Sequence, residues 1–225
     1  MSKNSFSPFI FIGFLCLLFT PLPVNAQGDS TRLTAKFKFK DGFYTTIDQF
    51  KHNQPAFALT DFKGSMVPKS SENALELLPN QSTQSLDIQQ VWGIVVNGTP
   101  YIRYTIDTAK KHSMTYQALQ IVGKLCYFSY SIEETTTVPM PVYDPIGGRL
   151  LYTGKVKNKA KNTFRKILSL VDGRMTDLNL ENLKHYTADD KKLQKSVAEL
   201  TANDPLQRLL KTLQIYNDRN PIYIH

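Results

Sequence analysis

The stretch "QVWGIVVNGTPYIRY", residues 90–104, predicts a β-hairpin and therefore a fold built around a sheet. Its Asn97-Gly98 dipeptide stands between two apolar runs. Such a dipeptide favours a two-residue type I′ turn, because that turn needs positive φ at both central positions. Counting outward from the turn places Trp92, the single tryptophan of the chain, opposite Arg103 on the neighbouring strand.

The same register places Pro100 at a position that needs no backbone N–H for the pairing within the hairpin. The missing donor points outward, so the sequence predicts an edge strand or a bulge there. Trp92 and Arg103 allow two interpretations. They form an exposed cation–π pair on a candidate binding surface, or the indole belongs to the core. We favour the core, because the turn and the alternation around it account for the stretch without a ligand.

Other segments also have strand patterns. The run "AKFKFK", residues 35–40, alternates apolar and basic side chains, as a protected edge strand does. In "KLCYFSYSIEE", residues 124–134, alternate residues from Cys126 to Ile132 share one apolar face, and the other face is more polar. The segment "FRKILSLVDGR", residues 164–174, is typical of a strand that ends at an Asp-Gly turn.

Between residue 40 and the hairpin at 90–104, the sequence has signals for a helix, a loop and a strand. Thr45, with Asp48 three residues later, predicts a capped short helix that ends before Pro55. The segment "KGSMVPKSSEN", residues 63–73, is expected to be a loop. The following "ALELLP", residues 74–79, is too short for periodicity to decide, and we favour a strand.

After residue 177 the pattern becomes helical. Asn179 is expected to cap a first helix, and Thr187 with Asp190 forms a capping box for a second. Pro205 opens a third helix, because proline suits the first turn. Its apolar stripe consists of Leu206, Leu209, Leu210, Leu213 and Tyr216 or Asn217. The predicted fold class is therefore α+β, with a mostly antiparallel β-rich body followed by a C-terminal segment of two to three helices.

The N-terminus has the pattern of a secretory signal. Lys3 precedes an apolar run at residues 9–19, which is shorter than the ~20 residues of a membrane span. Small residues then precede a cleavage site after Ala26. We therefore expect a cleaved signal peptide at 1–26, a β-rich body with one short helix at 27–176 and a helical segment at 177–225. No later run is apolar and long enough to predict a transmembrane span.

Charge and cysteine content describe an exported protein without disulfides. The segment 149–225 has 15 Lys/Arg and 8 Asp/Glu, whereas 27–148 has 11 of each. A basic half is typical of a protein with an anionic partner, or simply of a solvated surface. After removal of the signal, Cys126 is the single cysteine, so an intramolecular disulfide is impossible and the core must hold the fold.

Several motifs resemble those of a known group of proteins. The segments "GFYTTIDQFKHNQP", "VWGIVVNGTPYIRY" and "LQIYNDRNPIYIH" are similar to the opening, the central hairpin and the ending of uncharacterised exported proteins of Bacteroidota. The resemblance implies a location in the periplasm or at the cell surface and a β-rich body with a helical tail. It implies no catalytic or binding residues.

The sequence offers no pattern that predicts catalysis or a cofactor. The four histidines form no His-x-x-His pair, and a zinc site needs about four ligands in clustered spacings. Cys126 alternates with Phe128 and Tyr130 on an apolar face, which favours a buried thiol over a nucleophile. We therefore predict no catalytic, metal-ligating or cofactor-binding residues. Carboxylates that converge from distant segments cannot be recognised in this way.

Lysines recur at every second position in "GKVKNKAKN", residues 154–162. On a strand, Lys155, Lys157, Lys159 and Lys161 line one face, which can contact phosphates. We favour a solvated hairpin tip or a frayed ribbon as the explanation of these lysines, and export excludes the usual cytoplasmic nucleic-acid roles. Together with Trp92 and Arg103, these lysines make up the candidate binding surface.

The sequence thus predicts a non-catalytic binding or structural component of the bacterial cell envelope. Its expected partner is an anionic envelope component or another envelope protein, and neither nucleic acid nor a membrane span is expected. The alternative is an envelope or periplasmic enzyme that acts on glycan or peptide through carboxylates. A concave cluster of carboxylates would favour the enzyme, and an exposed aromatic or basic patch would favour binding.

Overall fold

The computed structural model describes residues 30–34, 36–80, 86–104 and 114–224. Its strands are β1 (Thr31–Arg32), β2 (Gly42–Tyr44), β3 (Gly64–Lys69), β4 (Ala74–Pro79), β5 (Gly93–Val96), β6 (Thr99–Arg103), β7 (Met114–Ala118), β8 (Leu125–Tyr143), β9 (Leu150–Ser169), β10 (Met175–Asp177) and β11 (Tyr223–Ile224). Its helices are α1 (Ile47–Lys51), α2 (Leu180–Tyr186), α3 (Gln194–Ala198) and α4 (Leu206–Arg219), with short 3-10 helices at Leu59–Asp61, Ser70–Glu72 and Ile88–Gln90.

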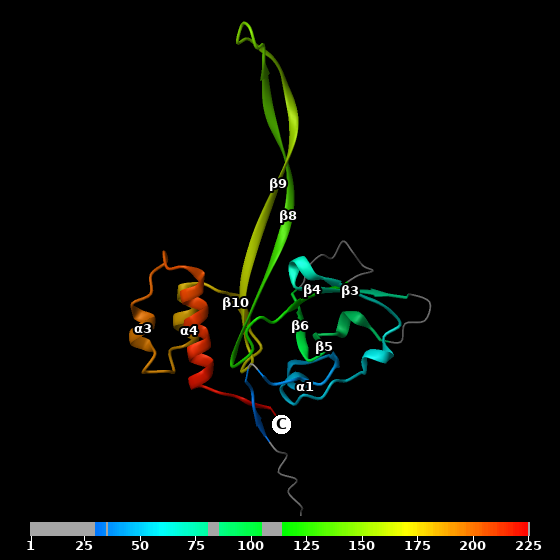
Figure 1. The fold of residues 1–225 in the computed structure, drawn as a ribbon, viewed down its shortest axis with the longest axis vertical. Coiled ribbons are helices and arrows are strands. Elements are labelled where there is room, and N and C mark those ends of the chain that lie inside the picture. Colours follow the sequence, from blue (N-terminus) through cyan, green and yellow to red (C-terminus); the bar gives the residue numbers. More distant parts are fainter. Residues whose placement is uncertain (1–29, 35, 81–85, 105–113, 225) are drawn as a thin grey trace, which may run out of the picture.

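The molecule has a broad body from which the β8–β9 hairpin projects as a long arm (Figure 1). In the described residues every strand pairing is antiparallel. Three helices follow the strands near the end of the chain. The expectation of a strand-rich, antiparallel body with late helices is confirmed.

A six-stranded sheet, in the order β2-β5-β6-β7-β4-β3, forms one half of the body. Alternate residues of β5 enter different cores because successive side chains of a strand point to opposite faces. Ile94 joins an outer core that contains Phe62, Leu77 and Tyr116. Val95 joins a central core that contains Phe39, Phe50, Ile102, Cys126, Phe128 and Leu168. The sheet is therefore buried on both faces at β5.

The β5–β6 hairpin has the register that the sequence predicts, from Val96 opposite Thr99 to Gly93 opposite Ile102. Its turn residues Asn97 and Gly98 have φ of 52° and 73°, so the prediction of positive φ at both positions is confirmed.

The turn is also held from outside the hairpin. The Asp41 carboxylate accepts hydrogen bonds from the backbone N–H of Asn97 at 3.1 Å and of Gly98 at 2.8 Å. A local signal and a long-range contact thus stabilise the same turn.

The prediction of an edge strand or bulge at Pro100 is wrong. Strand β6 lies inside the sheet, between β5 and β7. Its pairing with β7 begins one residue later, at Tyr101 opposite Ala118. The Pro100 carbonyl accepts a hydrogen bond from the Leu119 N–H at 2.9 Å, but proline has no N–H to return. The ladder therefore ends at Pro100, and a central strand tolerates the missing donor.

The expected strand at 35–40 is also wrong, because residues 36–40 are irregular. Phe39 is buried in the central core, and its ring stacks on Phe50 at a centroid distance of 4.2 Å. Phe37 packs edge-on against Phe39, with 4.8 Å between the ring centroids. Burial of these two rings decides the backbone path here, and it outweighs the strand-like alternation.

Two further local expectations need correction. The first half of the loop expected at 63–73 is strand β3, which pairs with β4 along its whole length and forms an edge of the sheet. An edge position tolerates Pro68. Helix α1 is capped by Thr46 rather than Thr45: the Thr46 hydroxyl accepts from the Gln49 N–H at 3.2 Å. The Gln49 side chain accepts in turn from the Thr45 N–H at 2.9 Å.

The base of the β8–β9 hairpin is a layer shared by two cores. Cys126, Phe128 and Leu168 point into the central core against the sheet. The intervening Leu125, Tyr127 and Ile167 point the other way, into a helical core with Leu183, Leu213 and Tyr216. The expected apolar face from Cys126 onward is confirmed at this base. The opposite face is equally apolar there, because helices α2–α4 cover it.

The C-terminal helices follow the sequence in part. Asn179 caps α2, with its side chain accepting from the Asn182 N–H at 2.8 Å, and the apolar stripe of α4 packs on the helical core, as predicted. The capping box of Thr187 and Asp190 is not formed. Thr187 ends α2, and its hydroxyl donates to the Leu183 carbonyl at 2.8 Å. Asp190 pairs with Arg219 and also accepts hydrogen bonds from the backbone N–H groups of Lys192 and Leu193, both at 3.1 Å, so it stabilises the turn before α3 without the predicted box.

The expected signal peptide at 1–26 lies outside the described residues. Where the description begins, β1 pairs with β11, so the two ends of the described chain lie side by side (Figure 1). Among the described helices, none combines the length and the apolar character needed to cross a membrane.

Candidate functional site: the projecting arm

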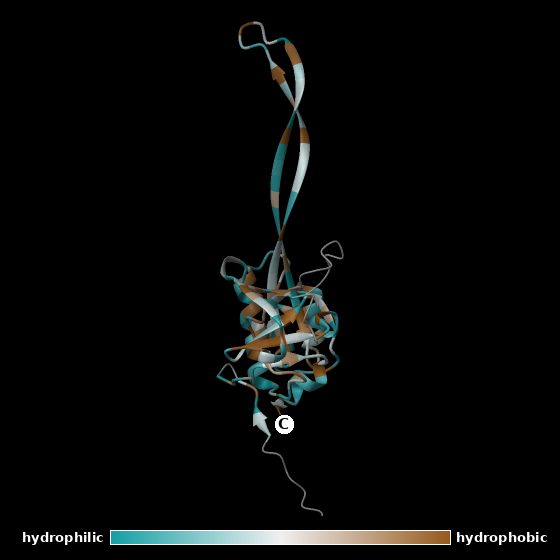
Figure 2. Ribbon diagram, turned by 90° about the vertical axis from the view of Figure 1, so that its right-hand side faces the viewer, coloured by the Kyte–Doolittle hydropathy of each residue, from teal (hydrophilic) through white to brown (hydrophobic). Residues whose placement is uncertain are grey.

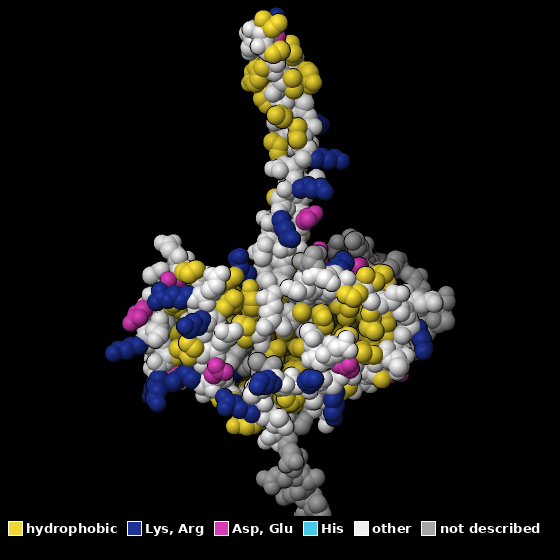
Figure 3. All heavy atoms as spheres, viewed as in Figure 1, with side chains coloured by type: hydrophobic (Ala, Val, Ile, Leu, Met, Phe, Trp, Pro, Cys, Tyr) yellow, Lys and Arg dark blue, Asp and Glu magenta, His cyan; other side chains and the backbone are white. Residues whose placement is uncertain are grey.

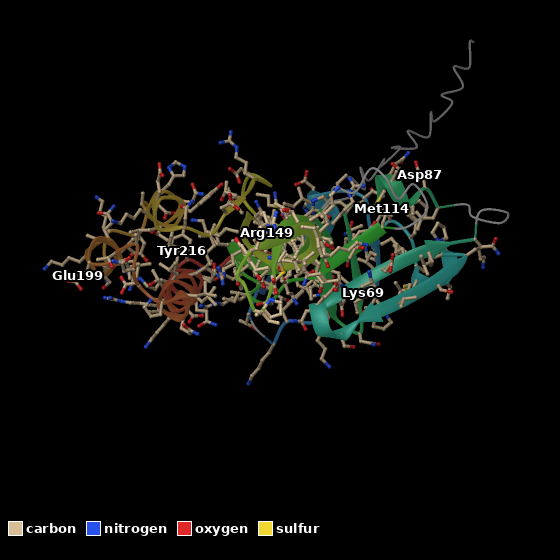
Figure 4. The ribbon with its side chains drawn as sticks, turned by 90° about the horizontal axis from the view of Figure 1, so that it is seen from above. Lys69, Asp87, Met114, Arg149, Glu199 and Tyr216 are labelled. Atoms are coloured by element: carbon tan, nitrogen blue, oxygen red, sulfur yellow. The ribbon has the colours of Figure 1, made fainter. Side chains whose placement is uncertain are left out.

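The arm comprises residues 132–162, where β8 and β9 continue beyond the body as an isolated pair of strands. Pairing is continuous from Ile132 opposite Asn162 to Val142 opposite Tyr152. This length corresponds to about 33 Å at 3.3 Å per residue. Seen from above, Arg149 near the arm's end lies between the sheet half, with Met114 and Lys69, and the helical half, with Tyr216 (Figure 4). The arm therefore rises from the junction of the two halves.

Contacts near the junction anchor the arm. The ring of Tyr130 stacks on Phe164 across the strands, at a centroid distance of 5.2 Å, and lies 4.2 Å from the ring of Tyr104 in the body. One step further out, the hydroxyls of Ser131 and Thr163 share a hydrogen bond of 3.0 Å. Beyond these contacts the arm is held by the pairing of β8 with β9, and its outer side chains are exposed.

The lysine row, Lys155, Lys157, Lys159 and Lys161, lies along the middle of this arm. All four side chains are exposed and, within the described part of the chain, none has an ion-pair partner within 4 Å. The alternate spacing on β9 places them on one face of the ribbon, as expected for a strand. Of the two expected settings, the hairpin tip is wrong, because the turn lies at residues 144–149 and the lysines lie on the paired ribbon below it.

That turn has residues that suit its geometry. The Asp144 carboxylate accepts from the Ile146 N–H at 3.0 Å, and its carbonyl accepts from the Gly148 N–H at 2.9 Å. Gly148 has a φ of 61°, which explains a glycine there.

The end of the arm is apolar, which the sequence analysis did not recognise. The arm tip consists of six large apolar side chains, each 51–97% exposed: Met140, Tyr143, Ile146, Leu150, Leu151 and Tyr152. Figure 2 shows the hydrophobic colour at the arm's end, and Figure 3 shows these side chains beyond the lysines. The signal was present in "VPMPVYDPIGGRLLY", residues 138–152, where Asp144-Pro145 and Gly147-Gly148 indicate a turn but not how far the flanking strands extend.

Trp92 and Arg103, the other candidate binding residues, lie in the body, away from the arm. Their backbones pair, with the Arg103 N–H donating to the Trp92 carbonyl at 3.1 Å. Their side chains separate. The indole is partly buried against the central core, 5.4 Å from the Phe50 ring, and the guanidinium donates to the Gln89 carbonyl. The structure thus gives Trp92 a packing role and does not join this pair to the lysine row.

Two polar clusters in the helical half serve packing rather than an open site. Arg219 donates to both oxygens of Asp190, at 2.6 and 2.9 Å, and these bonds hold the pKa of that carboxyl well below its usual value. The Tyr216 hydroxyl donates to Asp189 at 2.9 Å, and Lys124 pairs with the same carboxylate at 2.6 Å. Both clusters tie α4 to the segment that follows α2.

Cys126 is buried in the central core with no exposed surface. Burial raises the pKa of its thiol to about 12. A thiol in this state is a poor nucleophile, because the thiolate is the reactive form.

Two cavities in the described part of the body do not gather catalytic groups. One is formed by Phe62, Gly64 and Pro79 with their neighbours at the end of β3 and β4 and has no carboxylate. The other, beside Arg32, Leu119 and Asn217, has Asp218 as its one carboxylate. Across the described ranges, no three His, Cys, Asp or Glu residues gather in a way that could hold a metal ion.

Comparison of the chain with protein-family models, with curated proteins and with solved structures finds no match. The likeness of its short motifs to exported Bacteroidota proteins therefore stays a prediction. The function has to be argued from the arm itself.

Proposed function

We propose that this protein is a non-catalytic binding component of the bacterial cell envelope and that it binds through its arm. The observation that carries the proposal is the arm's surface. An exposed apolar end and a row of lysines without an ion-pair partner among the described residues extend beyond the body on a two-stranded ribbon. An exposed apolar patch of this kind is typical of an interaction site, and clustered lysines attract anionic partners.

The location in the envelope rests on the sequence. The signal-peptide pattern at residues 1–26 and the motifs shared with exported proteins support export to the periplasm or the cell surface. We assign the chain to the α+β class, because α2–α4 follow the strands rather than alternate with them. N-terminal sequencing of the protein from envelope fractions tests export: we expect Gln27 as the first residue, and retained Met1 would contradict cleavage.

The arm's role is tested by sedimentation of the purified mature protein with bacterial envelope fragments. Replacing Lys155, Lys157, Lys159 and Lys161 together by glutamine should reduce the bound fraction. The matched control replaces four exposed lysines of the helical half by glutamine: Lys184, Lys191, Lys192 and Lys195. Both variants lose four positive charges, so only a role of the arm predicts a difference between them. Equal binding by the two variants would refute the proposal.

A further inference from the structure

We propose that the arm tip enters the surface of a lipid bilayer that contains anionic lipid, and that the lysines of the row nearest the tip hold the arm over the headgroups. This inference rests on the proposed function and names the partner of the same arm. Three features of the arm support it: the distribution of its apolar side chains, the order of its charges and the state of its strand edges.

The apolar side chains are concentrated at the end that would meet a membrane first. Eight large hydrophobic residues in the described chain are more than half exposed, and six of them form the arm tip. Ile146, at the outermost turn, is 97% exposed. Burying an exposed apolar side chain is favourable, so such a cluster needs an apolar environment outside the protein.

These side chains surround the tip instead of lining one face. Val142 pairs with Tyr152, and after an irregularity in the ladder Tyr143 pairs with Leu150, on the next step of the ribbon. Successive steps point to opposite faces, so Tyr152 and Tyr143 are presented on different sides. A groove on a protein contacts one face of a ribbon, whereas a bilayer surrounds an inserted tip. Tyrosine also suits the membrane–water boundary, because it has an apolar ring and a polar end.

The charges follow in the order that an anionic surface requires. Beyond Glu134 the arm has five Lys/Arg, and Asp144 is its single acidic residue. Lys155 is four residues from Leu151, or about 13 Å along the strand, and each further lysine is about 7 Å more distant. If the tip enters by about 5–10 Å, as interfacial segments do, Lys155 lies within one Debye length, ~8 Å, of the headgroups. Lys159 and Lys161 lie well beyond that range.

The edges of the arm make strand addition a poor alternative. Pro139 and Pro141 remove two backbone donors from β8, and lysines occupy alternate positions of β9. Both devices discourage pairing of an edge strand with another chain, including a second copy of this protein. The arm therefore offers side chains rather than a free backbone edge to its partner, as a lipid surface needs.

The test is flotation of the purified mature protein with vesicles at 0.15 M salt. One set of vesicles is phosphatidylcholine alone, and the other contains about a third phosphatidylglycerol as its anionic lipid. We expect binding to the anionic vesicles and much less to the neutral ones. Ile146→Ser should reduce binding about tenfold or more, because the residue loses its transfer into the apolar layer. Val171→Ser, at an exposed β-branched residue outside the arm, is the matched control and should bind as the wild type does.

The order of the lysines gives a sharper comparison. Replacing Lys155 and Lys157 by glutamine should weaken binding to anionic vesicles about fivefold or more, since each lysine close to the surface contributes roughly fivefold. The same replacement at Lys159 and Lys161 should have a smaller effect, because those charges are screened. Equal effects of the two pairs would overturn an arm that enters end-on.

A fluorescent label gives a direct reading of insertion. Cys126 is fully buried, so an environment-sensitive thiol dye should react only with an introduced cysteine. A dye on Ile146→Cys reports the arm tip, and a dye on Lys161→Cys reports the part of the arm next to the body. We expect a blue shift with anionic vesicles for the tip label only. No shift at the tip, or equal shifts at both labels, would overturn the inference.

The outcomes separate this inference from the proposed function. If the protein sediments with envelope fragments through its arm but ignores both kinds of vesicle, the binding proposal stands and the lipid partner is refuted. If the wild type is a dimer in solution and Ile146→Ser is a monomer, the tip binds a second copy and the lipid inference is likewise overturned. If the lysine variant binds envelope fragments normally, the proposed function itself fails.

Discussion

Neighbouring residues of β9 provide a test of whether the two halves of the body unfold together. Ile167 is fully buried in the helical core, and Leu168, 1% exposed, points into the central core. Truncating either to alanine should cost about 2–5 kcal/mol, the range for buried aliphatic residues. Taking about 3 kcal/mol, the melting temperature of a domain of this size should fall by roughly 6–12 °C.

The two cores have separate optical probes. Trp92 packs against the central core, so its fluorescence follows that half, whereas far-UV circular dichroism at 222 nm follows α2–α4. Because the hairpin base belongs to both cores, we expect each substitution to lower both midpoints equally, in one cooperative transition. Ile132→Ala, on the same hairpin but 43% exposed, is the control and should cost less than about 1 kcal/mol.

Different shifts of the fluorescence and circular dichroism midpoints would refute a shared layer. If Ile167→Ala lowers the circular dichroism midpoint and leaves the Trp92 midpoint unchanged, the helical segment is an independent unit. The hairpin base would then be a surface on which that segment rests rather than a shared layer.

Three further predictions concern single positions. Gly98→Val should destabilise the protein by about 1–2 kcal/mol in urea unfolding, because φ at this position is 73°. The atoms nearest to a new Cβ are 3.6 Å away, so backbone strain rather than a clash sets the cost, and an unchanged unfolding midpoint would contradict the turn assignment. Cys126 should resist a thiol reagent at pH 8 in the native protein and react on unfolding, and rapid native labelling would contradict its burial. Arg219 lowers the pKa of Asp190 below 3.8, so the stability from this pair is present above about pH 3.8 and is lost as the pH falls through the lower, folded-state pKa. Asp190→Asn should therefore destabilise the protein at pH 7, and a difference from wild type that does not shrink in acid, in melts across pH, would contradict the pair.

Local signals in the sequence determined the features that depend on a few neighbouring residues. The Asn97-Gly98 turn and its register could be predicted because positive φ at two positions is a local steric requirement. The cap of α2 by Asn179 and the apolar stripe of α4 were predictable for the same reason: a cap and a helical period lie within one element.

Tertiary structure decided the features that depend on what lies opposite. Pro100 occurs in a central strand because β7 begins to pair one residue beyond it, and Asp190 is held by Arg219 from the far end of α4. The lysine row lies in the middle of an arm rather than at a tip because β8 and β9 remain paired as far as residues 142 and 152. The sequence between them is compatible with a loop or with a long ribbon, and only cross-strand pairing, which links residues far apart in the chain, distinguishes the two.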